Sequence, residues 1–249
     1  MTAANGLYKV FHTIVPRGGI NQPMATRVPF DPAWHSAATL AGLAERSQAF
    51  RFYTRTHRTE PHNPAPGGNI RYGYEAVETV AFDTLGGAIA FREAAGTVGM
   101  EHLDPTSTWL VTKERVGING APKGPRDTGR GIKVITSMKR RPGMNLIEFR
   151  RHWDDHVGYV AATQGISRFT TNHVVDDDYE VAEPPVDGFV EVWFRTSEDL
   201  QICFSDPLMG GIQQTHNDLF IDRRTFFTIQ CVNAEQWVSG RRAEGLREW

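Results

Sequence analysis

The chain has 249 residues, of which 40% are hydrophobic and 22% are charged, and its formal net charge is -2. This is an ordinary globular composition. The near-neutral net charge excludes the overall positive potential that is typical of proteins that bind nucleic acid. The two cysteines, Cys203 and Cys231, are too few for a disulfide framework and form no Cys-x-x-Cys motif. We therefore expect packed thiols and no structural zinc.

The sequence contains no apolar run that approaches the roughly 20 residues of a membrane helix. The first six residues lack the charged and apolar regions of a signal peptide. We therefore expect a cytoplasmic protein with no membrane partner.

The N-terminal part, residues 1–116, is predicted to alternate strands and helices in the order βαββαβ. The expected strands are residues 7–15, 50–56, a segment ending at Phe82, and 108–113. One helix is expected from a cap at Asp31 to about Ser47, and a second between Phe82 and about Thr97. This order is that of the ferredoxin-like unit.

Residues 117–131 are rich in Gly and Pro and have no periodic apolar pattern, which predicts a linker. The second part, residues 132–238, then repeats the same order, and residues 239–249 form a tail. The strands of this second part are expected at residues 132–140, 167–175, 188–195 and within 219–232. A helix is predicted to begin at an Asn145 cap, with Glu148 placed as in a capping box, and a second helix to begin at Ser197.

Two short sequence echoes favour an internal duplication: residues 51–57 resemble 168–173, and residues 80–84 resemble 192–196. A ferredoxin-like sheet leaves one face bare, and that face must be buried. We therefore predict an α+β fold of two tandem ferredoxin-like modules that pack as a dimeric α+β barrel. Closure within one chain and closure between two chains, as a homodimer, remain alternatives, as do two unrelated modules.

The second part resembles the EthD family of dimeric α+β barrel proteins in an ordered series of residues. The series is Met138-Lys139-Arg140-Arg141-Pro142-Gly143, Phe149, His152-Trp153, His156, Ser167-Arg168-Phe169, Thr171-Asn172-His173, Asp187-Gly188, Glu191-Val192-Trp193-Phe194 and Asp218-Leu219-Phe220-Ile221-Asp222. The resemblance implies that His156 lines a cavity. Relatives in the superfamily act as lactone isomerases, dehydratases, decarboxylases and cofactor-free monooxygenases. The first part lacks the Lys-Arg-x-Pro-Gly and His-Trp-x-x-His patterns, so it resembles a degenerate copy.

His156 is the first candidate for catalysis, because it borders the apolar stripe of its helix and an imidazole transfers protons near neutral pH. The alternative is a histidine packed in the interior. His173, beside Asn172 at the end of a strand, is expected to act as a second acid or base, to donate a hydrogen bond to the substrate, or to cap the strand.

Glu191 lies in an otherwise apolar strand, where a carboxylate must be paired or protonated. It is expected either to face the cavity, as an acid or as the partner of a histidine, or to face water, in which case Trp193 would point inward. Trp153 and Trp193 are either core residues or, with Asn172, part of the substrate site.

His152 and His156 share one helix face, as zinc ligands do in His-Glu-x-x-His, but the residue after the first histidine is Trp and no third ligand follows. We expect neither a metal nor another cofactor. The expected function is proton-transfer chemistry, as a lyase or isomerase, on an oxygenated apolar or aromatic small molecule. The alternatives are an oxidative enzyme, cofactor-free or with haem, and a binding protein without catalysis.

Overall fold

The computed structural model describes residues 6–15, 37–58, 74–98, 103–119, 132–225, 227–238 and 241–242. The first part of the chain contains β1 (Tyr8–Ile14), α1 (Ala37–Arg46), β2 (Phe50–Arg58), β3 (Ala76–Phe82), α2 (Leu85–Ala95) and β4 (Thr108–Asn119). Its strands are arranged β2-β3-β1-β4, all antiparallel. This is the ferredoxin-like order that the sequence predicts.

The second part has the same core with additional helices. Its elements are β5 (Ile132–Met138), α3 (Leu146–Ala161), β6 (Arg168–Val174), α4 (Asp176–Val181), β7 (Gly188–Phe194), α5 (Ser197–Ser205), a π-helix η3 (Leu208–Gln213), α6 (Gln214–Phe220), a short 3₁₀ turn η4 (Arg223–Thr225), β8 (Phe227–Val238) and β9 (Arg241–Arg242). The four main strands are arranged β6-β7-β5-β8, and β9 extends β8.

Two seams join these sheets into a closed barrel. β4 pairs with β6, where Thr112 lies opposite Val174, and β2 pairs with β8, where Tyr53 lies opposite Trp237. Both edges of each four-stranded sheet are therefore hydrogen-bonded to the other sheet. The predicted dimeric α+β barrel is thus formed within one chain.

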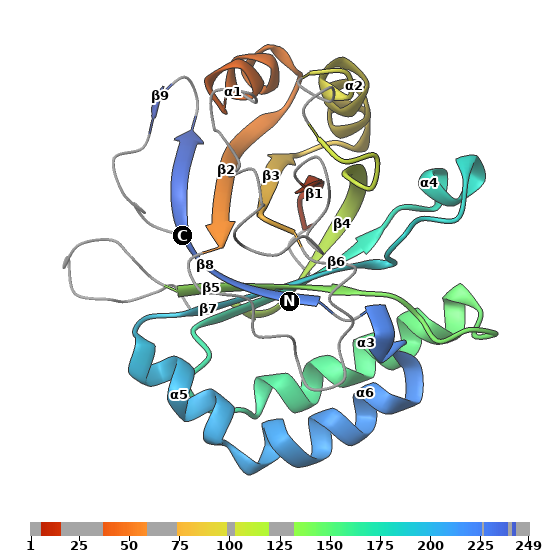
Figure 1. Cartoon of the computed structure of the whole chain (residues 1–249), viewed down its shortest axis with the longest axis vertical. Helices are drawn as coiled ribbons and strands as arrows, with labels where there is room; N and C mark the ends of the chain where they lie inside the picture. Colours follow the sequence, from red (N-terminus) through yellow and green to blue (C-terminus); the bar gives the residue numbers. More distant parts are fainter. Residues whose placement is uncertain are drawn as a thin grey trace.

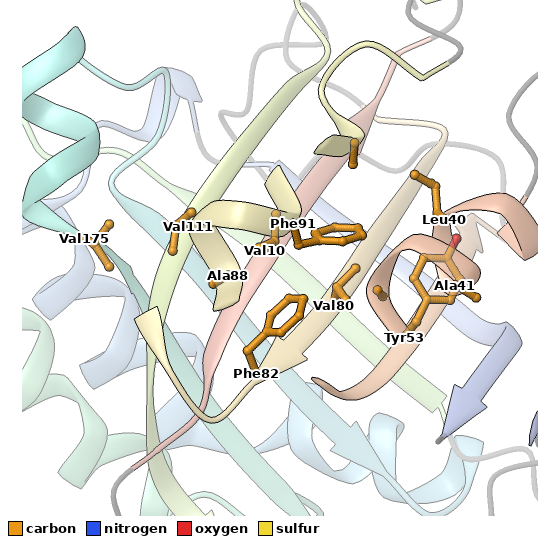
Figure 2. Packing of buried hydrophobic residues seen from close by; sticks show 12 residues of the cluster. Val10, Leu40, Ala41, Tyr53, Val80, Phe82, Ala88, Phe91, Val111 and Val175 are labelled. Carbon is orange, nitrogen blue, oxygen red and sulfur yellow. The ribbon is translucent and has the colours of Figure 1, made fainter. Parts of the chain in front are cut away.

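The helices cover the outside of the barrel. Figure 1 shows α1 and α2 over the first sheet and α3, α5 and α6 over the second, with the strands between these layers. Under α1 and α2, alternate strand residues such as Val10, Val80 and Tyr53 pack against Leu40 and Phe91 (Figure 2). None of the helices in the described ranges is long and apolar enough to cross a membrane.

Strand residues of the opposite parity face the barrel interior, because side chains alternate along a strand. One part of this interior is apolar: Phe11 and Phe189, from the two halves of the chain, stack with ring centroids 4.4 Å apart, beside Val77, Leu110 and Ile135. Another part is charged and holds Lys9, Glu114 and Glu191, as described below.

The structure differs from the predicted elements at several places in the described ranges. β4 continues to Asn119, three residues into the segment predicted as a linker. Gly117 allows a close approach there, since a Cβ would lie 2.7 Å from Phe169 and from Val157. The last strand, predicted within residues 219–232, runs from Phe227 to Val238, and Leu219 and Phe220 end α6. Residues 31–36, 120–131 and 243–249 lie outside the described ranges.

Candidate functional site

Glu191 lies inside the barrel, at the centre of a buried charged network. Lys9 Nζ lies 2.6 Å from both Glu191 Oε2 and Glu114 Oε1, and Lys133 Nζ lies 2.5 Å from Glu191 Oε1. Burial alone would raise the pKa of Glu191, but the ammonium groups of Lys133 and Lys9 outweigh it and hold the pKa of this carboxyl well below its usual range. Glu191 is therefore an ion-paired carboxylate and not a protonated acid.

Asn172 and Trp193 belong to the same interior network. Asn172 Nδ2 donates to Glu191 Oε2 at 3.2 Å and to the Phe189 carbonyl at 3.2 Å. Lys133 Nζ and Arg168 Cζ lie 5.1 and 5.3 Å from the Trp193 ring. Of the two alternatives for Glu191, the one in which it faces water while Trp193 points inward is wrong, because residues two apart on a strand share one face.

His173 follows Asn172 directly on β6 and therefore lies on the other face of the sheet, beneath α3. Its ring centroid is 4.3 Å from that of Trp153, and neither ring nitrogen has a hydrogen-bond partner. Burial, and then the guanidinium groups of Arg115 and Arg150, lower the pKa of His173 to about 3, so its imidazole is neutral at physiological pH. The sheet separates it from Glu191, and the predicted orientation of a histidine by Glu191 is therefore wrong.

His156 lies on the buried face of α3 and is only 3% exposed. Its Nδ1 lies 3.0 Å from Nδ1 of His216 on α6, and the two rings are stacked with planes 4° apart. Burial, and then the neighbouring His216, lower the pKa of His156 to about 4. The His156–His216 pair therefore holds two neutral imidazoles, one of which donates a hydrogen bond to the other.

An aromatic shell surrounds the His156–His216 pair. The Phe220 ring lies 5.8 Å from His156 and 5.3 Å from His216, and Tyr159 lies 5.1 Å from His216. The π-helix η3 runs directly into α6 and packs on α3 through Gln213, which donates to the Tyr159 carbonyl at 3.5 Å. π-Helical turns occur frequently at functional sites.

Sequence reasoning missed His216, and no local signal identified it. It lies 60 residues after His156, in a segment that the sequence did not predict as helical. The packing of η3 and α6 on α3 brings the two together. The His156–His216 pair is therefore a product of the tertiary fold.

A surface groove of 620 Å³ lies at the Met138–Gly143 turn of the family-like series. It is lined by Lys139, Arg140, Arg141, Pro142, Gly143, Met144, Glu183, Pro184, Pro185, Asp222 and Thr225. Lys139 and Arg140 both form ion pairs with Glu183 and with the buried Asp187. This groove therefore contains paired charges and none of the predicted catalytic residues.

Within the described ranges, no three His, Cys, Asp or Glu side chains are arranged to hold a metal ion. His152 lies beside His216, with ring centroids 5.9 Å apart, but does not complete such a set. The absence of a metal or cofactor stays a prediction.

These features define the class of the protein: a dimeric α+β barrel made by a single chain, with a histidine pair beneath one helical layer. Residues 141–224 match the family model described as the EthD domain. The matched segment lies in the second half of the chain and covers about a third of it.

Three solved structures resemble the whole chain. An anthrone oxidase-like protein shares 7% identity with a TM-score of 0.57, and 99% of each chain is covered. A candidate monooxygenase from Fusobacterium nucleatum shares 8% with a TM-score of 0.53, covering 100% of this chain and 99% of its own. A chlorite dismutase from Candidatus Nitrospira defluvii shares 14% with a TM-score of 0.49, covering 93% and 92%. No curated protein matches the sequence. At these identities the likeness concerns the fold alone.

Proposed function

We propose that this protein is an enzyme that transfers protons to and from an oxygenated apolar or aromatic small molecule, with His156 as the acid/base group. The observation that carries the proposal is the partly buried His156–His216 hydrogen bond of 3.0 Å. A neutral imidazole is the form that removes a proton, and a second imidazole on its Nδ1 selects the tautomer and orients the ring.

The pair is also suited to exchanging a proton with solvent. His156 is almost fully buried, whereas His216 is partly exposed. A proton taken by His156 can pass through its hydrogen bond to His216 and then to water. The surrounding rings of Phe220 and Tyr159 favour an apolar or aromatic substrate over a charged one.

Removal of a proton from the carbon beside a carbonyl, or from the hydroxyl of a phenol, produces an electron-rich carbon in the substrate. This carbon can then react in three ways. Reprotonation elsewhere is isomerisation, and expulsion of a leaving group is lyase chemistry. Transfer of its electrons to dioxygen is the oxidative alternative. The oxidase-like and monooxygenase names of the two structures with TM-scores above 0.5 favour keeping that alternative.

The described residues give haem no defined site. The His173 ring lies against Trp153, and His156 is bonded to His216 through Nδ1, so only Nε2 of His156 could serve as an axial ligand in this pair of candidates. The groove near Arg140 is lined by no histidine. We assign no step to haem.

The test is solvent-deuterium exchange into a panel of aromatic ketones and phenols in D₂O, followed by NMR, with dioxygen uptake recorded in the same reactions. His156→Phe keeps a buried ring but removes the base, so exchange should fall about 10²- to 10⁴-fold. Arg151→Gln, an exposed change on the same helix, is the matched control.

The outcomes separate the candidate functions. Exchange without dioxygen uptake supports an isomerase or lyase, and uptake that depends on His156 supports the oxidative enzyme. Equal exchange in wild type and His156→Phe removes His156 as the base. Tight binding with no exchange by the wild-type protein would indicate a binding protein without catalysis.

A further inference from the structure

Three neighbouring side chains beneath α3 bury four polar atoms that have no hydrogen-bond partner. The atoms are Nδ1 and Nε2 of His173, Oγ1 of Thr171 and Nε1 of Trp153. His173 is 4% exposed, and the other two residues are fully buried. Buried polar side chains are nearly always hydrogen-bonded, so a group of this kind requires a physical explanation.

The three residues lie where α3 packs on the sheet at β6. Thr171 and His173 are two residues apart on β6 and so share its helix-facing side. Trp153 reaches the sheet because the residue opposite His173 is Gly188, where a Cβ would lie 2.7 Å from the Trp153 ring. The indole and imidazole rings are then in contact at 4.3 Å.

The hydrogen-bonding groups of this Thr171–His173–Trp153 cluster are of mixed kind. A neutral imidazole has one donor and one acceptor, an indole has one donor, and a threonine hydroxyl has both. A carboxylate ligand offers acceptors only, and an ammonium ligand offers donors only. A hydroxyl group both donates and accepts, so it can pair with one nitrogen of His173, with Trp153 Nε1 and with Thr171 Oγ1.

The cluster lies close to the surface at Asp154. Asp154 Oδ1 lies 3.8 Å from His173 Nε2, too far for a hydrogen bond. Asp154 is ion-paired with Arg115, and both side chains are about half exposed, at 43% and 51%. Exposed ion pairs of this kind are weak, so this pair can open to admit a ligand.

We infer that the Thr171–His173–Trp153 cluster binds the hydroxyl group of a phenol-like aromatic ligand, with His173 accepting its proton in a hydrogen bond. Trp153 Nε1 and Thr171 Oγ1 donate to the ligand oxygen. The inference rests on the proposed function in that the ligand is the substrate of the enzyme, but its test measures binding alone.

The experiment uses the full chain with ¹⁵N-labelled histidine and follows the ring nitrogens of His173 by NMR. 2-Naphthol should shift both signals and saturate, whereas 2-methoxynaphthalene, which cannot donate, should bind at least tenfold more weakly. In His173→Phe, which retains a ring against Trp153, both compounds should bind with the same affinity. Thr171→Val is the second variant and should weaken 2-naphthol alone.

Three results would overturn the inference. The first is that 2-naphthol does not shift the His173 signals, and the second is that the wild-type protein binds the two compounds with equal affinity. The third is a crystal structure in which an ordered water molecule links His173 to Thr171 and is not displaced by 2-naphthol. Failure of the proposed function is read separately. If deuterium exchange did not depend on His156 but 2-naphthol still bound at His173, the proposed function would be refuted and the binding of a hydroxyl group by the cluster would not.

Discussion

Buried titratable side chains in this protein take opposite charge states because their neighbours differ. Glu191 stays ionised at 1% exposure because two lysine ammonium groups lie within 2.6 Å. His156 and His173 are buried to a similar degree, yet no carboxylate lies within hydrogen-bond distance of either, and burial therefore favours the neutral form. Charge pairing therefore keeps the buried Glu191 ionised, whereas the two buried histidines, which have no such partner, stay neutral.

The two buried histidines should make the protein less stable as the pH falls. An unfolded histidine binds a proton below about pH 6.5, whereas folded His156 does so only near 4 and His173 only near 3. Between these values the unfolded state holds more protons, so the free energy of unfolding decreases with falling pH. Urea unfolding midpoints from pH 7.5 to 4.5 measure this. His156→Phe together with His173→Phe should flatten the slope, and an unchanged slope would contradict these environments.

At the scale of elements, α3 organises both candidate sites. Its buried face carries Trp153 toward His173 on the sheet and His156 toward His216 on α6. The position of this helix therefore sets the geometry of both sites. Its start is fixed by the Asn145 side chain, which accepts a hydrogen bond from the Glu148 backbone at 2.8 Å, as the sequence predicts.

Removing the cap of α3 should destabilise the protein measurably. Asn145→Ala leaves the Glu148 amide without its acceptor and should lower the free energy of unfolding by about 1 kcal/mol. Asn145→Asp keeps an acceptor at the same place and is the control. Chemical unfolding of the three proteins makes the comparison. An alanine variant as stable as the aspartate variant would show that the cap does not hold the helix.

At the scale of the molecule, the barrel unites the two halves of the chain. Strand pairing at β4–β6 and β2–β8 completes both sheets, so a second copy is not needed to close the barrel. A homodimer stays a prediction, and the helical layers carry exposed apolar side chains that suit one. There Phe204, Leu219 and Ile202 are 56%, 51% and 41% exposed.

The Lys9–Glu191 pair should couple the stability of the halves, because Lys9 comes from β1 and Glu191 from β7. Lys9→Met or Glu191→Met alone strands buried charge and should cost about 3 kcal/mol. The double variant should cost less than the sum of the two single ones, since each single variant already loses the Lys9–Glu191 pair, although Glu114 and Lys133 each still lose one partner. Denaturant unfolding, with one cooperative transition in each variant, checks this cycle. Strictly additive losses would mean that the two side chains do not interact.

The sequence by itself determined the fold class and the strand order, because apolar periodicity, caps and Gly or Pro breaks are local signals. It also identified Asn145 as a cap and marked His156, His173 and Trp153. Only the tertiary structure decided that Glu191 and Asn172 face the barrel interior while His173 faces α3. The sequence shows which strand residues share a face, but the packing around the strand determines which face points into the barrel. The tertiary structure alone paired His156 with His216 and closed the barrel within one chain, because these contacts join residues far apart in sequence and leave no local pattern.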